Sequence, residues 1–375
     1  MIKTFDSILS IDKQAWNSCV PDNHPFLKYE FYEALERSKC IGKTVGWYPQ
    51  FLCLFKENKL IAILPTYIKT HSYGEFIFDW AWAQAYERHG LDYYPKLLSA
   101  LPHTPVSAAK VISQQGISIQ DFTSELELIG QKFRTSSSHF LFTTKDEAND
   151  LEKLNFTQRH SLQFHWHNKN YQSFDEFLSG LRKNKRKNIK KERQFIADSN
   201  IEIKEKTGEQ LSESDANYLA DVYFTTITKK WSQAYLNREF FTHWLKLQAN
   251  QIILLMAYRD SKPIAAAIHL KSDSRLFGRY WGCTEEVQFL HFELCYYRAM
   301  EIAIREKLEV VEAGAQGEQK LLRGFEPITI LSHHKINQPD FAMAINKFIK
   351  QEAEQLGEVK KEYEKLLPFK RTSDQ

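Results

Sequence analysis

The chain has 375 residues, of which 43% are hydrophobic and 26% are charged, and these values exclude a disordered chain. Its formal net charge of +3 is too small to indicate a nucleic-acid-binding protein from the total alone. The five cysteines are scattered without a C-x-x-C pair, so a disulfide framework is not expected and a cytoplasmic location is favoured. No apolar run approaches the roughly 18 residues of a membrane span, and we expect neither export nor membrane insertion.

The first half of the chain is expected to alternate helices and strands. Apolar residues at positions 26, 27, 31 and 35 have helical spacing. The runs 51–55 and 60–68, joined by a polar turn, are typical of a β-hairpin. The further expected elements are a strand at 74–80, helices at 81–98 and 121–133, a strand at 139–143, a helix at 146–154 and a strand at 157–166.

The second half begins near residue 171 and continues the alternation. The expected elements are helices at 174–197, 214–228, 238–247 and 289–306 and strands at 201–204, 252–258, 264–270, 275–282 and 309–314. A long charged helix at 341–367 follows. The sequence therefore predicts an α/β protein of two similar halves, residues 1–170 and 171–340, with a C-terminal helix and tail at 341–375.

A weak internal repeat relates the two halves. Phe55-Lys-Glu-Asn-Lys59 before an Ile-Ala strand resembles Tyr258-Arg-Asp-Ser-Lys262 before another. Gly74 and Trp80 then fall near Gly278 and Trp281. A fixed offset over about 25 residues favours duplication, because chance rarely aligns a hairpin, its turn and the next strand together.

A dense basic run lies between residues 182 and 193. Lysine and arginine surround much of the expected helix there, and Glu192 is the single opposing acid. Such a helix can attract a phosphate-rich partner by counterion release, or it can be a solvated helix face. The residues expected to bind a polyanionic donor are Lys185, Arg186, Lys190 and Lys191.

Two polar segments of the second half could carry chemistry. His291 and Glu293 lie in the first turn of a helix after an aromatic strand, where unpaired backbone N–H groups can meet a substrate. Alternatively, Glu293 offsets the helix dipole and His291 caps a neighbour. Glu312 begins a glycine-bearing loop that either admits a ligand or is a simple turn with surface charges. The expected substrate-binding residues are Arg279, Tyr280, Trp281, Tyr296, Gln316, Glu318, Lys320, Arg323, Lys230 and Trp231.

Two further sets of residues are given ordinary roles. Asp79 lies between aromatic residues at a strand-to-helix boundary, where an aspartate is most often a helix cap. His165 and His167 alternate onto one face of a strand, but no acidic residue or cysteine is close to them in sequence. No metal site is therefore predicted.

Several of these segments resemble the FemAB-like family, which is labelled peptidoglycan biosynthesis or recognition and belongs to the GNAT superfamily. The segments are Tyr73-Gly-Glu-Phe with Phe78-Asp-Trp, Lys185-Arg-Lys-Asn-Ile, Gly278-Arg-Tyr-Trp-Gly-Cys, His291-Phe-Glu-Leu-Cys-Tyr-Tyr and Glu312-Ala-Gly-Ala-Gln-Gly-Glu. The resemblance covers nearly the whole chain. It implies two tandem GNAT-like halves, each a mixed, largely antiparallel sheet flanked by helices.

The resemblance implies transfer of an acyl or aminoacyl group onto an amine of a cell-wall-related or other small acceptor, such as a muropeptide. Fem transferases take the aminoacyl group from aminoacyl-tRNA, and the basic helix matches theirs. We expect His291, Glu293 and Glu312 to be catalytic: Glu312 or His291 as the base, and Glu293 with Gln316 orienting the amine. Backbone N–H groups of residues 280–282 would hold the oxyanion.

Two alternatives compete with this interpretation. In an acyl-CoA-dependent N-acyltransferase, a loop of the Q/R-x-x-G-x-G/A type would hold the pyrophosphate. Glu285 and Glu286 stand in its expected place, and their charge would repel the pyrophosphate. The third possibility is a non-catalytic protein that recognises peptidoglycan or RNA, because a fold does not fix a function.

Overall fold

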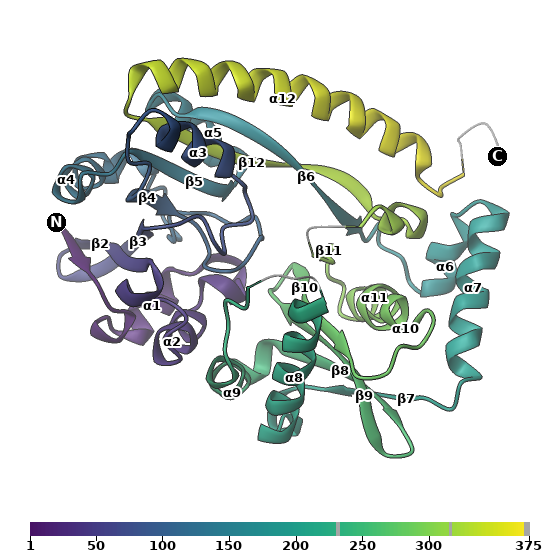
Figure 1. Ribbon diagram of the computed structural model, residues 1–375. Helices are drawn as coiled ribbons and strands as arrows, with labels where there is room; N and C mark the ends of the chain where they lie inside the picture. Colours follow the sequence, from purple (N-terminus) through teal and green to yellow (C-terminus); the bar gives the residue numbers. More distant parts are fainter. Residues whose placement is uncertain (230–232, 315–316, 371–375) are drawn as a thin grey trace. The chain divides into compact units, whose positions relative to one another are not determined.

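The computed structural model describes residues 1–229, 233–314 and 317–370, and the chain divides into two compact units (Figure 1). Unit 1 comprises Met1–Ser161 and Thr329–Glu358, and unit 2 comprises Leu162–Ile328 and Val359–Gln375. Most of the expected N-terminal half thus lies in unit 1 and most of the expected C-terminal half in unit 2. The C-terminal helix α12 (Pro339–Leu366) has residues in both units.

Unit 1 is built on a mixed sheet with the strand order β1-β2-β3-β4-β5-β12. These strands are β1 (Ile2–Phe5), β2 (Trp47–Lys56), β3 (Lys59–Lys69), β4 (Lys96–Ser99), β5 (Ser137–Thr143) and β12 (Glu326–Ile336). Its helices are α1 (Lys13–Cys19), α2 (Tyr29–Arg37), α3 (Trp80–Arg88), α4 (Thr123–Phe133) and α5 (Lys145–Lys153), with residues 339–358 of α12. Its core includes Leu52, Leu64, Leu97, Phe122 and Phe140.

Unit 2 is built on a sheet with the strand order β7-β8-β9-β10-β11-β6. These strands are β6 (Thr157–His167), β7 (Glu202–Lys206), β8 (Ile252–Arg259), β9 (Lys262–Lys271), β10 (Arg275–Cys283) and β11 (Val310–Glu312). Its helices are α6 (Phe174–Ser179), α7 (Lys183–Ala197), α8 (Glu213–Lys229), α9 (Arg238–Leu247), α10 (Leu290–Phe292) and α11 (Arg298–Arg305), with a π-helical turn at Glu293–Tyr297 and a 3₁₀ helix at Glu318–Arg323. Its core includes Trp166, Leu276, Tyr297, Ile302 and Val311.

The two sheets have the same order and the same strand directions. The described neighbours in unit 1 are antiparallel except for the parallel pair β4 and β5. In unit 2 the described neighbours are likewise antiparallel except for β10 and β11. The sixth position is filled by β12 in unit 1 and by β6 in unit 2. The expected duplication is therefore confirmed in the topology.

The repeated hairpin is confirmed down to its register. β2 and β3 pair Lys56 with Lys59 at the turn, and β8 and β9 pair Arg259 with Lys262. Each hairpin also has a register shift one residue before the turn pair. The continuation of the repeat was wrong, however: residues 70–79 form a loop, and the strand that follows the hairpin in unit 1 is β4.

Three helix boundaries also differ from the sequence prediction. The expected helix at 81–98 ends at Arg88, and its last residues belong to β4. The helix expected at 174–197 is interrupted between Ser179 and Lys183, and the one at 289–306 contains the π-helical turn. Among the described residues, no helix combines the length and the apolar composition needed to cross a membrane.

Candidate active site

A β-bulge in β10 determines which way the aromatic end of this strand faces. β10 pairs Gly278 with His269 and Trp281 with Ala267, so it has an extra residue relative to β9. Because side chains alternate along a strand, the extra residue turns Trp281 to the same face as Gly278. Trp281 there meets His291 of α10 at a ring distance of 5.2 Å.

The aromatic group extends from His291 into the helix that follows. The His291 ring lies 5.1 Å from that of Tyr296, and the Tyr296 ring stacks on Phe292 at 5.7 Å. Burial raises the pKa of the Tyr296 hydroxyl, so this group keeps its proton at neutral pH. The structure thus brings together three of the predicted site residues, Trp281, His291 and Tyr296.

The parallel pairing of β10 with β11 is short. It joins Arg275–Phe277 to Val310–Glu312, after which β11 ends while β10 continues to Cys283. At this point the two backbones are close, because a Cβ added to Gly278 would lie 3.4 Å from the carbonyl oxygen of Glu312. Ligands of open α/β sheets commonly bind where parallel strands end in this way.

Glu312 is buried, and it lies on the sheet face opposite Val311 and the α11 side of the core. Its Oε1 accepts a hydrogen bond from Nη1 of Arg275 at 2.8 Å. Its Oε2 lies 3.8 Å from Nε2 of His165 and makes no hydrogen bond to the described residues. Glu312 therefore lies on the face of the sheet opposite to the one on which Trp281 meets His291.

His165 is neutral in this setting. Burial lowers its pKa, and the charges of Arg275 and Lys320 lower it further, whereas Glu312 raises it. A neutral imidazole beside a carboxylate can donate or accept a hydrogen bond. The sequence had placed His165 on one strand face without finding a partner, because Glu312 is brought opposite it by the β6–β11 pairing.

Glu293 is buried between two arginines. It accepts hydrogen bonds from Nε and Nη2 of Arg193 at 3.1 and 3.0 Å, and Nε of Arg298 lies 3.0 Å away. Nη1 of Arg193 also binds Glu301 at 2.6 Å. Both oxygens of Glu293 are thus held in ion pairs, an arrangement that fixes the π-helical turn against α7.

Buried cations hold the loop that follows β11. Lys320 is 1% exposed, and its Nζ donates to the carbonyl oxygen of Gly314 at 2.6 Å. Arg323 is 7% exposed; its Nη2 contacts both oxygens of Glu192 at 2.8 and 2.9 Å, and its Nε contacts the hydroxyl of Tyr297 at 2.8 Å. These contacts hold Gly314 and the 3₁₀ helix Glu318–Arg323 in place within unit 2.

The other predicted substrate-binding residues are more dispersed. The guanidinium of Arg279 lies 5.1 Å above the ring of Tyr280, and Tyr280 packs against Tyr223 of α8 at 5.3 Å. Glu318 is exposed, and its Oε1 accepts a hydrogen bond from Tyr363 at 2.6 Å. Gln316, Lys230 and Trp231 lie outside the described residues.

In the basic helix α7, Glu192 forms an ion pair within unit 2, and most of the lysines are exposed. Glu192 and Arg193 face the body of unit 2 through the ion pairs with Arg323 and Glu293 described above. Lys190 and Lys191 are exposed, and Lys190 lies 3.2 Å from Asp175. Lys185 and Arg186 are half-buried, and the exposed lysines 183 and 187 extend the same cationic surface.

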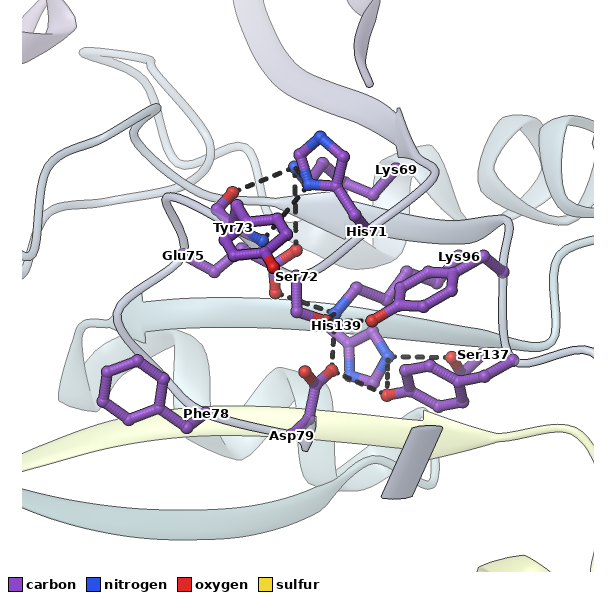
Figure 2. Close-up of polar contacts among 12 residues, drawn as sticks. Lys69, His71, Ser72, Tyr73, Glu75, Phe78, Asp79, Lys96, Ser137 and His139 are labelled. Carbon is purple, nitrogen blue, oxygen red and sulfur yellow. Dashed lines mark hydrogen bonds and ion pairs between the residues drawn. The ribbon is translucent and has the colours of Figure 1, made fainter. Parts of the chain in front are cut away.

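A second polar network, in unit 1, was missed by the sequence analysis. Nζ of Lys96 contacts Glu75 at 2.8 Å, Asp79 at 2.5 Å and the hydroxyl of Ser72 at 2.8 Å (Figure 2). Asp79 was noted as a helix cap, but its side chain makes no capping hydrogen bond. It also accepts a hydrogen bond from Tyr93 at 2.7 Å. No local sequence signal marks Lys96, because its partners come from another segment.

Solved structures confirm the fold. FemX matches with a TM-score of 0.57 and 8% identity over 90% of this chain and 98% of that chain. A conserved protein from Bacteroides thetaiotaomicron matches with a TM-score of 0.56 and 11% identity over 90% of this chain and 100% of that chain. The C-terminal domain of a putative lysylphosphatidylglycerol synthetase from Agrobacterium fabrum matches with a TM-score of 0.54 and 10% identity over 90% of this chain and 96% of that chain. No curated protein sequence matches the chain.

Sheet order, strand directions and these matches define a fold of two tandem α/β halves that share one topology. The family model described as FemAB-like, peptidoglycan biosynthesis/recognition, matches residues 7–371. The chain therefore belongs to the FemAB-like family.

Proposed function

We propose that unit 2 transfers an acyl or aminoacyl group from an activated donor to the amine of a cell-wall-related or other small acceptor. The observation that carries this proposal is the end of β11 beside the bulge of β10, where Glu312 is buried next to Arg275 and His165. Family membership supports the cell-wall context. The same family supports a location in the cytoplasm, where aminoacyl-tRNA is made.

In the proposed reaction the amine nitrogen attacks the donor carbonyl carbon, and Glu312 accepts the proton that the nitrogen loses. The carbonyl oxygen becomes an oxyanion, which backbone N–H groups of residues 280–282 stabilise. The carbonyl then forms again as the bond to the leaving atom breaks, and the leaving atom takes a proton; this atom is the ester oxygen of an aminoacyl-tRNA or the thioester sulfur of an acyl-CoA. Tyr296, which keeps its proton at neutral pH, is the proposed donor of that proton.

The burial of Glu312 suits this role. A carboxylate whose Oε2 makes no hydrogen bond to a described residue has a lone pair available for a proton. The Arg275 ion pair holds the other oxygen and so fixes the direction of the side chain. Glu293 is assigned as a positioning residue, because accepting a proton would require it to break an ion pair with Arg193 or Arg298.

His291 is the proposed orienting residue in this scheme. It contacts Trp281 and Tyr296 on the face opposite Glu312, so it would orient the acceptor or the donor from that side. If Glu312 were not the base, His291 would be the remaining candidate. The proposed donor surface is the cationic face of α7, with Lys185, Arg186, Lys190 and Lys191 binding phosphates of an aminoacyl-tRNA.

Acyl-CoA is the second candidate donor. The sequence argued against it because of the charges of Glu285 and Glu286, but the structure pairs both carboxylates with cations. Glu285 forms an ion pair with Arg259, and Glu286 lies 2.5 Å from Lys229. Since both carboxylates are paired, their repulsion of a pyrophosphate is weaker than their position alone indicated.

A donor screen tests the proposal. Purified protein would be incubated with an amine-bearing muropeptide and with either aminoacyl-tRNA or acyl-CoA, and the acceptor would be followed by mass spectrometry. An aminoacyl adduct formed only with charged tRNA supports the first donor, and an acyl adduct formed from acyl-CoA supports the second. Binding of the muropeptide or tRNA without a product from any donor would instead identify a recognition protein.

A further inference from the structure

Two lysines of unit 1 lie directly opposite each other in its sheet. Lys69 on β3 pairs in register with Lys96 on β4, and both side chains are 0% exposed. Like charges directly opposite in a sheet repel each other, and burial increases the cost of each. A nearby anion stabilises such a pair. Burial also lowers the pKa of Lys69 to about 7, so Lys69 carries its full charge only below that pH.

The anions come from residues 70–79, a loop between β3 and α3 that we call the strap. Lys96 binds Oε2 of Glu75 at 2.8 Å and Oδ2 of Asp79 at 2.5 Å, and Nζ of Lys69 lies 3.9 Å from Oε1 of Glu75. Figure 2 shows both carboxylates directed at Lys96, whereas Phe78 of the same strap points away from them. The cations are thus fixed on strands, and the anions are carried by a loop.

The duplicated fold shows what is unusual in this arrangement. Lys96 stands two residues before Leu98, which pairs with His139 of β5. At the corresponding place in unit 2, Arg275 stands two residues before Phe277, which pairs with Glu312 of β11. The cation of unit 2 is neutralised by an acid of its own sheet. In unit 1 a histidine occupies that position, so the counter-charge comes from the strap.

Each of the two strap carboxylates has one oxygen without a hydrogen bond to the described residues. Glu75 and Asp79 are each 3% exposed, yet Oε1 of Glu75 and Oδ1 of Asp79 make no hydrogen bond to any described residue. Burial also raises the pKa of Glu75 to about 7 against the opposing charge of Lys96. The strap backbone has φ of +62° at Phe76, a value that a residue with a side chain rarely adopts.

We propose that Lys69 and Lys96 form an oxyanion-binding site in unit 1 that Glu75 and Asp79 of the strap occupy in the closed form. A carboxylate or phosphate group of a ligand takes the place of Glu75 when the strap opens. The site belongs to unit 1, whereas the proposed transfer chemistry belongs to unit 2, and it does not depend on that chemistry.

The first test replaces the carboxylate of Glu75 from solution. Glu75→Ala removes the atoms that acetate contains, so acetate should raise the Tm of this variant and saturate, while chloride at equal ionic strength should not. Glu33→Ala is the control, because Glu33 is also buried in unit 1 but pairs with a single half-exposed arginine, Arg37, among the described residues. Acetate should leave the Tm of the control unchanged.

The second test asks whether an external anion displaces the strap in the wild-type protein. Hydrogen exchange of the strap amides should become faster as inorganic phosphate or acetate is added at constant ionic strength, and it should reach a plateau. Lys69→Met should lose this response. Comparing the two anions distinguishes a phosphate ligand from a carboxylate ligand.

The two tests together support or overturn the proposed oxyanion site. Rescue of Glu75→Ala together with faster strap exchange in the wild type supports the site. Absence of rescue shows that the lysine pair does not take an external oxyanion. Rescue without any change in wild-type exchange shows that Glu75 is a permanent structural partner, which also overturns the proposal. If Glu75→Ala does not fold, Glu75→Gln serves, and its strap should respond at lower phosphate concentration than the wild-type strap.

Discussion

Replacing Lys96 by methionine should strongly destabilise unit 1. Methionine has a similar length but no charge, so Glu75 and Asp79 would stay buried without the cation that they share. Removing one partner of a buried ion pair costs about 3 to 5 kcal/mol. In a domain of this size that loss lowers Tm by roughly 6 to 20 °C.

The pH dependence of Lys96→Met distinguishes lost charge from lost packing. In the wild type, burial raises the pKa of Asp79, but Lys96 and His139 outweigh burial and hold it at about 2. Its contribution is therefore present above the unfolded pKa of 3.8 and lost as pH falls through about 2. Without Lys96, burial raises the pKa of Glu75 further and that of Asp79 above its unfolded value, so the folded variant gains stability as pH falls.

Urea unfolding of the wild type and of Lys96→Met between about pH 5 and 8 measures this difference. The deficit of the variant should be largest at the upper end of this range and should shrink towards the lower end, where the carboxyls are protonated. Lys335→Met is the control, because Lys335 in the same unit donates to a backbone carbonyl and forms no ion pair with a carboxylate of the described residues. A deficit below about 1 kcal/mol, or one that does not change with pH, would refute the argument.

Three further predictions concern unit 2. Gly282→Ala should cost about 1 to 3 kcal/mol in unfolding free energy, because its Cβ would lie 2.3 Å from the backbone oxygen of Val222, whereas Gly116→Ala meets nothing within 4 Å. Glu293→Gln should lower Tm measurably by calorimetry, since two arginines lose a charged partner; an unchanged Tm would contradict the positioning role. Lys191→Ala should reduce the salt slope of tRNA binding by about 1 in filter-binding assays, and an unchanged slope would remove this residue from the donor surface.

The sequence predicted those features that depend on local patterns. Both hairpins were found because apolar runs flank a short polar turn, and the structure pairs Lys56 with Lys59 and Arg259 with Lys262 as expected. The π-helical turn and the break at residues 180–182 were missed, because helical spacing continues through both. β6 follows the strands of unit 1 in the chain but completes the sheet of unit 2, and β12 follows the strands of unit 2 but completes the sheet of unit 1. This pairing depends on the whole chain and has no local sequence signal.

The candidate site was predictable to a smaller extent. Glu312 was recognised because a charged residue precedes a glycine-bearing loop, but Arg275 and His165 become its neighbours only through the strand register. The strand expected at 74–80 failed for a related reason. Its apolar and aromatic residues are typical of a strand, yet Glu75 and Asp79 of this segment point inward to Lys96, which lies 17 or more residues further along the chain.

A single-turnover assay of Glu312→Gln tests the central claim most directly. Glutamine keeps the shape of the side chain and its contact with Arg275 but cannot accept the proton of the amine. With the donor identified in the screen, Glu312→Gln should bind donor and acceptor normally and lose at least about 100-fold in the transfer rate. The control Glu306→Gln, which alters a surface pair with Lys271, should keep the wild-type rate. An unchanged rate in Glu312→Gln with an unchanged Tm would contradict the assignment of the base.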